Sequence, residues 1–182
     1  CRVSSEEPEG PLTGKYVGNL GDSTNKEEES TVWDAWKKGH HLGVICSSDH
    51  QATHTSFANV YAETNTRENI FQEIKNRHTY GSTDNIILDF RCKQGIQGDI
   101  ISINEKPEFI INITGTDQIK MLELIKNFET EIKKKSKYKN YSLTWKDESL
   151  VKGENLYYVR LVQEDGQTAL SSPIWVHYCR KK

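Results

Sequence analysis

The sequence predicts two structural classes in one chain, an α/β region followed by an all-β region. Up to about residue 80, two amphipathic segments with helical spacing alternate with short apolar runs, a pattern typical of strands joined by crossover helices. From residue 86 onward, short β-like runs are separated by turn residues, as in a β-sandwich. We therefore expect an α/β segment over residues 1–82, irregular over residues 1–28, and a β-sandwich domain over residues 83–182.

The first elements expected are one helix and two short strands. A helix is predicted near residues 29–39, because apolar side chains recur at helical spacing and Gly39 supplies a C-cap. The apolar run of residues 42–46 predicts a buried strand that opens into a polar loop, and residues 57–61 resemble a second strand. This order favours parallel strands in an α/β layer.

A second helix is expected to begin at Asn65 or Thr66, because either side chain can act as the N-cap. It should end near His78, before the first run of the all-β region. Its inner face would carry the apolar side chains at helical spacing, which are Ile70, Phe71 and Ile74.

Strands in the second half are expected at residues 86–92, 109–114, 119–127, 142–145, 156–163 and 174–178. Turn residues divide these runs, and Asp165-Gly166 marks the clearest hairpin. Four large aromatic side chains are expected in the sandwich core or at its rim: Trp145, Tyr157, Tyr158 and Trp175.

Composition excludes several partner classes. A net charge of -2 gives no global positive field, so nucleic acid is not expected as a partner, and the basic residues 133–139 fit an exposed loop between strands. No apolar run reaches the roughly 18–20 residues of a membrane span, so membrane insertion is not expected. The cysteines are scattered without a Cys-x-x-Cys pair, which argues against a zinc ribbon and leaves the disulfide state open.

The segment Ser47-Ser-Asp-His-Gln-Ala-Thr-His54 is the strongest candidate for chemistry. Asp49 and His50 would lie at the carboxyl end of the predicted strand, and His54 follows His50 at a four-residue spacing. Carboxylate and imidazole ligands suit Zn, Mn or Fe, so we predict a divalent metal site here. The alternative is a solvated loop in which Asp49 caps a turn. Adjacent Ser, Asp and His residues argue against a serine triad, whose members come from separate elements.

Arg77 and His78 follow the second predicted helix and are candidate binders of an anionic small-molecule substrate. The alternative is that positive side chains simply favour the end of a helix. His40 and His41 are expected at the surface.

Residues 33–91 resemble the end of a metal-dependent hydrolase of the PHP superfamily, named for polymerase and histidinol phosphatase. The resemblance is carried by four motifs: Trp33-Asp-Ala-Trp-Lys-Lys-Gly, Leu42-Gly-Val-Ile-Cys-Ser-Ser-Asp-His, Thr53-His-Thr-Ser-Phe-Ala-Asn-Val-Tyr-Ala-Glu and Arg77-His-Thr-Tyr-Gly-Ser-Thr-Asp-Asn-Ile-Ile-Leu-Asp-Phe-Arg91. Residues 157–167 and 171–176 resemble the C-terminal β-domain of one bacterial branch. The resemblance implies a distorted β/α barrel whose two or three divalent metals activate water, usually to hydrolyse phosphoesters.

The superfamily's early His-x-His motif and its middle Glu and His ligands have no counterpart in this chain. The resemblance therefore implies a C-terminal fragment whose partner is the missing N-terminal barrel portion. The last ligand motif is usually Asp-x-His, whereas Gln51 stands where that His would be. Asp49 carries over best, and either His50 or His54 would supply the imidazole. Members of this branch are often exported, which favours a periplasmic location.

Two functions follow as hypotheses. The first is the C-terminal portion of a metal-dependent, phosphoesterase-like hydrolase, to which Asp49, His50 and His54 contribute the last metal ligands. Because a catalytic metal commonly needs at least three protein ligands, the isolated chain is expected to bind metal weakly and hydrolyse little. The alternative is a non-enzymatic β-sandwich interaction module with a structural Asp-His loop.

Overall fold

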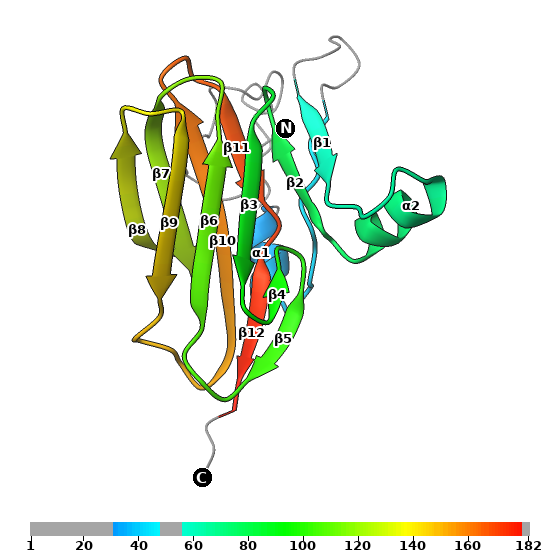
Figure 1. Ribbon diagram of the computed structural model, residues 1–182. Helices are drawn as coiled ribbons and strands as arrows, with labels where there is room; N and C mark the ends of the chain where they lie inside the picture. The colour runs from blue at the N-terminus through cyan, green and yellow to red at the C-terminus, as the bar shows by residue number, and fades with distance from the viewer. Residues whose placement is uncertain (1–30, 48–55, 180–182) are drawn as a thin grey trace.

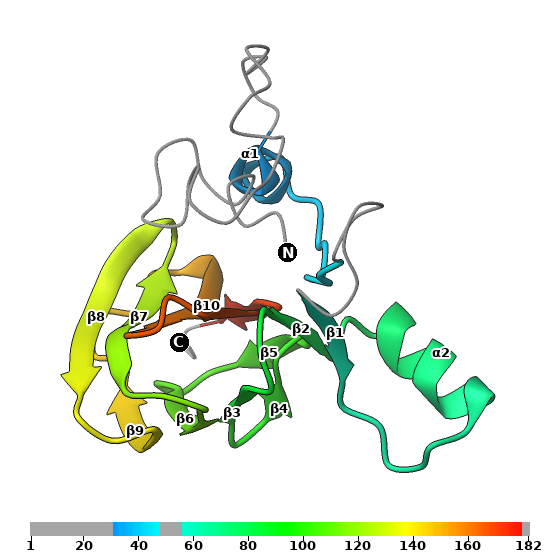
Figure 2. The same cartoon turned by 90° about the horizontal axis from the view of Figure 1, so that it is seen from above.

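Two sheets pack face to face in the computed structural model, which describes residues 31–47 and 56–179 (Figure 1). Within these residues, the larger sheet has eight strands and the smaller sheet has four. Seen from above, α1 lies over the larger sheet, and the smaller sheet lies on the opposite side (Figure 2). The described chain is therefore a β-sandwich with one helix on its outer face.

The larger sheet is built around its longest strand, β10. On one edge β10 pairs with β7, which pairs with β8; on the other edge β11 and β12 pair with successive parts of β10. Next in the sheet, β2 pairs with β11, β5 pairs in parallel with β12, and β1 pairs with β2. The bounds are β1 (Phe57–Val60), β2 (Thr79–Ser82), β5 (Ile100–Ile103), β7 (Ile119–Lys126), β8 (Glu129–Ser136), β10 (Gly153–Gln163), β11 (Thr168–Ser171) and β12 (Ile174–Tyr178).

The smaller sheet is antiparallel, in the order β4-β3-β6-β9. Its strands are β3 (Ile87–Cys92), β4 (Gly95–Ile96), β6 (Glu108–Thr114) and β9 (Asn140–Lys146). Burial alternates along β3 and β6, because successive side chains of a strand point to opposite faces. One face of this sheet therefore covers the core while the other meets solvent.

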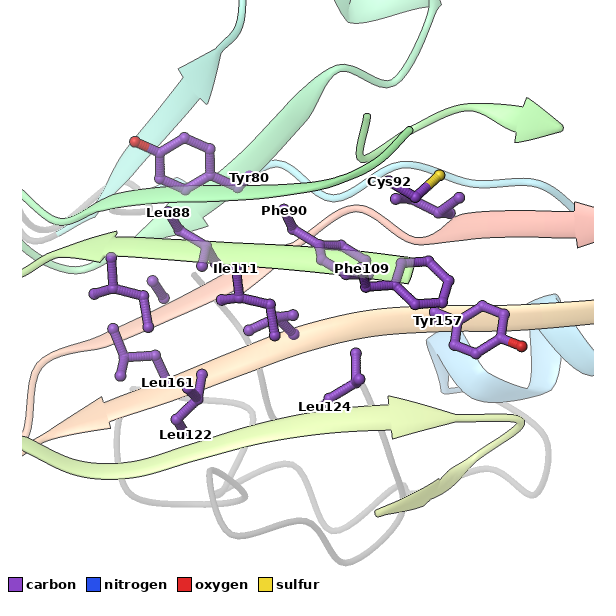
Figure 3. Packing of buried hydrophobic residues seen from close by; sticks show 14 of the residues in the cluster. Tyr80, Leu88, Phe90, Cys92, Phe109, Ile111, Leu122, Leu124, Tyr157 and Leu161 are labelled. Carbon is purple, nitrogen blue, oxygen red and sulfur yellow. The ribbon is translucent and has the colours of Figure 1, made fainter. Parts of the chain in front are cut away.

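The core between the sheets is apolar and aromatic (Figure 3). The rings of Phe90 and Phe109 stack with centroids 5.5 Å apart, and Tyr157 from the larger sheet lies 4.4 Å from the Phe109 ring centroid. Tyr157 is fully buried in this core and Trp145 is half-buried at its rim, as predicted, whereas Tyr158 and Trp175 are fully buried on the outer face of the larger sheet.

Helix α1 (Val32–Lys37) covers the outer face of the larger sheet. A capping box between Thr31 and Asp34 fixes its start. Trp36 is buried against Tyr158 with ring centroids 5.3 Å apart, and the Trp33 Nε1–H donates to the Tyr158 hydroxyl over 2.8 Å. The predicted helix in residues 29–39 is thus confirmed over its central part.

Helix α2 (Arg67–Lys75) begins after Thr66, one of the two predicted N-caps. It ends before His78, because Asn76 is the C-cap and Arg77 turns to a φ of 65°. The predicted inner face was wrong for two of its three residues: Phe71 is 62% exposed and Ile74 is 43% exposed, whereas Ile70 is partly buried. The apolar spacing correctly predicted a helix, but the sandwich does not cover that face.

The expected α/β arrangement is wrong for the described residues. Residues 42–46 are not a strand, and Leu42 and Ile45 are 49% and 64% exposed. The Val44 N–H donates to the side chain of Ser172 over 2.8 Å instead of to a neighbouring strand. β1 and β2 flank α2 but pair antiparallel, so the described residues do not form a β/α barrel.

The six strands predicted in the second half are all present as β3, β6, β7, β9, β10 and β12; β12 has the predicted bounds and the other five have shifted ends. Residues 133–139 were expected as a loop, but residues up to Ser136 belong to β8, an edge strand with mostly exposed side chains. Such charges suit an edge because they oppose pairing with another chain. The domain boundary between residues 82 and 83 stays a prediction. β2, which ends at Ser82 in the first predicted domain, pairs with β11 in the second.

The cysteines should differ in reactivity. Cys46 is disulfide-bonded, whereas Cys92 and Cys179 carry free thiols. Burial raises the pKa of the Cys92 thiol, which lowers the fraction of reactive thiolate, and Cys179 is exposed. Iodoacetamide should therefore modify Cys179 in the folded chain, Cys92 after denaturation, and Cys46 only after reduction. Mass spectrometry checks the order, and rapid native labelling of Cys92 would contradict it.

Candidate functional site

The predicted metal ligands Asp49, His50 and His54 lie outside the described residues. The segment of residues 42–47 that precedes them is described, and it is held on the outer face of the larger sheet. Cys46 is buried there, and the Trp36 Nε1–H donates to the Leu42 carbonyl oxygen over 3.0 Å. This stem of residues 42–47 therefore has a fixed position on the sandwich.

Arg77 lies between this stem and the sandwich. Its Nε–H donates to the Gly98 carbonyl oxygen over 2.9 Å, and its guanidinium carbon lies 5.7 Å from the ring centroid of Trp175. On the stem side, a Cβ atom at Gly43 would lie 2.7 Å from the Arg77 Cβ, so glycine permits this close approach. The structure thus brings Arg77 against the chain that leads to the predicted metal loop.

His78 bridges two carboxylates from different parts of the chain. Its Nδ1 contacts Glu73 Oε2 on α2, and its Nε2 lies 2.9 Å from Asp99 Oδ1 in the turn before β5. Asp99 Oδ2 also accepts the Ile96 N–H over 2.8 Å, which orders the turn. His78 therefore links α2 to the β4–β5 turn.

A buried polar junction lies next to Arg77 and His78. The Thr79 Oγ1 and Ser172 Oγ atoms are 3.0 Å apart, and the Ser172 N–H donates to the Thr79 carbonyl oxygen over 3.1 Å. Gln97, fully buried, donates from Nε2 to the same carbonyl oxygen over 3.3 Å. Gln97 and Ser172 were not predicted as site residues, because no local sequence pattern distinguishes them from surface polar residues. These bonds join β2, the β4–β5 turn and the β11–β12 connection.

The described geometry gives Arg77 and His78 a positioning role, since both side chains hold neighbouring elements together. Their predicted binding of an anionic substrate stays a prediction. In residues 31–47 and 56–179, His, Cys, Asp and Glu side chains do not gather in threes that could hold a metal ion.

His41, expected at the surface, is half-buried and pairs through Nε2 with Glu154 Oε2 at 2.9 Å. Its ring centroid lies 5.0 Å from that of Trp175.

Two buried carboxylates elsewhere in the sandwich are paired. Burial alone would raise the pKa of Asp147, but hydrogen bonds from Lys126 and Tyr157 hold it below its ordinary value. Burial would likewise raise the pKa of Glu123, but hydrogen bonds from Lys133 and Arg160 hold it low. The Arg160 Nε–H donates to Glu123 Oε2 over 2.6 Å, and Lys133 Nζ lies 2.9 Å from Glu123 Oε1.

These lowered pKa values predict a loss of stability in acid. Asp147 and Glu123 stabilise the fold fully above their unfolded-state pKa values, about 4, and lose that contribution as the pH falls through their lower folded-state values. The urea midpoint should stay level between about pH 7 and 5 and fall below about pH 4. Urea titrations across this range check it, and Glu123→Gln should weaken the acid dependence. A midpoint that stays level down to pH 2.5 would contradict the prediction.

None of the helices in the described part of the chain is long and apolar enough to cross a membrane.

Three chlamydial relatives, each named as an uncharacterized protein, match most of the chain. The chain is 26% identical over 189 residues to a protein of Chlamydia trachomatis and 25% identical over 187 residues to one of Chlamydia muridarum. Each match covers 86% of this chain and 30% of the relative. A Chlamydia pneumoniae protein is 31% identical over 129 residues, covering 61% of this chain and 21% of that protein. The chain thus spans less than a third of the length of these relatives.

Among solved structures, the fibronectin(III)-like modules of Clostridium thermocellum CbhA match with a TM-score of 0.33 and 14% sequence identity. That match covers 51% of this chain and 99% of the module chain.

One protein family matches half of the chain, over residues 8–99, and its description is a protein of unknown function, DUF3604. This stretch includes α1, the stem of residues 42–47, α2, Arg77 and His78. The description names no activity, so the resemblance to PHP hydrolases stays a prediction. The chain belongs to the DUF3604 family.

Proposed function

We propose that the described part of this chain is a non-enzymatic β-sandwich interaction module within a longer DUF3604-family protein. The observation that carries the proposal is how the apolar side chains are distributed between buried and exposed positions. The two sheets complete a core of their own, while apolar side chains of α2 and the stem stay largely exposed. The relatives are more than three times as long as the segment this chain matches, so they contain other regions for such a module to contact.

Burial of these side chains would favour association. Phe71 and Ile45 are 62% and 64% exposed, and fully burying a large apolar side chain stabilises by about 1.5–3 kcal/mol. In contrast, Phe90 and Phe109 are already fully buried between the sheets. Contact with another protein region can therefore occur without unfolding the sandwich.

A chimera tests the proposal. The segment of the Chlamydia trachomatis relative that matches this chain is replaced by residues 1–182, and hydrogen exchange is compared with the isolated chain. Fusion keeps the two parts at a high effective concentration, so even a weak interface is detected. We expect slower exchange at some surface of the described residues in the chimera. No change at any described residue would overturn the proposal.

The non-enzymatic part is tested on the isolated chain. Residues 1–182 are assayed for hydrolysis of p-nitrophenyl phosphate with Zn²⁺, Mn²⁺ or Fe²⁺, and no turnover above the metal-only blank is expected. Robust hydrolysis that a chelator abolishes would overturn the non-enzymatic role.

A second candidate function is the C-terminal portion of a metal-dependent hydrolase of the PHP type. The contact between Gly43 and Arg77 favours it, because that contact places a cationic side chain against the stem of the loop that carries Asp49, His50 and His54. Asp49 with His50 or His54 would hold a divalent metal, which would supply water activation. Arg77 would then bind an anionic small-molecule substrate.

This second candidate predicts that Asp49→Ala removes chelator-sensitive phosphoesterase activity from the chimera, whereas Glu63→Ala, an exposed change outside the loop, leaves it unchanged. Equal activity in the Asp49→Ala and Glu63→Ala chimeras would contradict the hydrolase role.

The disulfide at Cys46 supports an oxidising compartment such as the periplasm for either function.

A further inference from the structure

Helix α2 stands outside the sandwich. Both views show it beyond β1, at the edge of the larger sheet (Figures 1 and 2). None of the nine residues of α2, all of them described, is buried. A helix of this length is marginal by itself in water, so contacts outside the helix must keep it formed.

Those contacts lie at its two ends and along one side. Thr66 caps the first turn by accepting the Asn69 N–H over 3.3 Å. Glu73, on the side away from Phe71, contacts His78, whose other ring nitrogen reaches Asp99. This bridge through His78 fixes which face of the helix is turned toward the sandwich. The opposite face is therefore presented outward in a defined orientation.

The outward face has an apolar centre and a cationic rim. Phe71 and Ile74 supply the apolar surface, and helical spacing places Arg67 on the same face, four and seven residues before them. Lys75 Nζ lies 5.8 Å from the Phe71 ring centroid. Glu68 is the exposed acidic residue beside this face, so the positive charges outnumber the negative one.

We infer that this face of α2 docks on the part of the longer DUF3604-family protein that lies outside the matched segment. The inference rests on the proposed function and names the surface that performs it. About 70% of each of the two longer-matched relatives lies outside the match, which supplies a partner region in the same polypeptide. An amphipathic helix binds in an apolar groove through such spaced anchors. The cationic rim selects a groove edged by acidic side chains.

The same chimera, in which residues 1–182 replace the matched segment of the Chlamydia trachomatis relative, tests this surface. We expect the amides of α2 to exchange on the order of tenfold more slowly in the chimera than in the isolated chain. Phe71→Ser with Ile74→Ser should abolish that difference. Ile87→Ser, which changes a 55% exposed residue of β3, is the matched control and should leave it unchanged. Arg67→Glu with Lys75→Glu should reduce the protection, because it reverses the charge of the rim.

Each other outcome overturns the inference. Protection elsewhere in the sandwich, with α2 unchanged, would refute docking through α2 and leave the proposed function standing. Protection nowhere would refute both. If the isolated chain sediments as a dimer and α2 becomes protected as its concentration rises, the partner is a second copy, which refutes the inference. Slow exchange of the β10 amides in every variant shows that the sandwich itself remains folded.

Discussion

Replacing Asp147 by Ala is expected to lower the free energy of unfolding by about 3–5 kcal/mol. The carboxylate is fully buried, lies 2.7 Å from Lys126 Nζ and accepts the Tyr157 hydroxyl over 2.5 Å. Without it, the Lys126 ammonium keeps hydrogen bonds to Ser149 but loses its buried countercharge. Because natural domains are stable by about 5–15 kcal/mol, this loss is a large part of the total. Urea unfolding at pH 7 measures it.

The next residue provides the control. Glu148 pairs with Lys106 on the surface, where water screens the charges, so Glu148→Ala should leave the urea midpoint unchanged. Asp147→Leu combined with Lys126→Met should recover much of the loss, since an apolar replacement leaves no unpaired charge. If Asp147→Ala costs no more than Glu148→Ala, the buried pair does not contribute as its geometry indicates.

The strands that the sequence predicted correctly are those whose own side chains include an apolar set that covers a core. β3 and β6 alternate apolar and polar side chains, because one face covers the core and the other meets solvent. β8 has no such apolar set. Its residues are mostly exposed and charged, and its pairing with β7 places it in the sheet. An exposed edge strand depends on its neighbour, so it cannot be recognised from its own pattern.

The wrong expectations in the first third have one physical cause. Apolar periodicity indicates that a face is suited to burial, but it does not indicate which protein region covers that face. Phe71, Ile74 and Ile45 were therefore expected in a core of this chain, and the sandwich leaves them exposed. The same residues carry the proposals on docking. Apolar spacing therefore marked side chains suited to burial, but it did not show that the sandwich leaves them uncovered.

At the candidate site, residue type marked Arg77 and His78, but their partners could not be predicted. Gly98 and Asp99 lie 21 residues later and reach them through the fold. Gly98 is a turn residue with a φ of 102°. Its second role, allowing the Arg77 backbone to approach, depends on packing between distant segments and leaves no local signature.

That packing predicts a large effect for Gly98→Ala. A Cβ atom at Gly98 would lie 2.3 Å from the Arg77 carbonyl oxygen, so β2 and the β4–β5 turn would have to separate. We expect the free energy of unfolding to fall by about 2–5 kcal/mol, the sum of a strained left-handed backbone and an overpacked contact.

Gly153→Ala is the matched control, because its φ of 101° is nearly the same and no described atom lies within 4 Å of its Cβ position. It should cost about 1–2 kcal/mol from backbone strain alone. Urea unfolding measures both variants, and near-ultraviolet circular dichroism should show a changed Trp175 environment in Gly98→Ala alone, since Arg77 packs on that ring. Equal losses in the two variants would show that the close approach of Gly98 to Arg77 does not constrain the site.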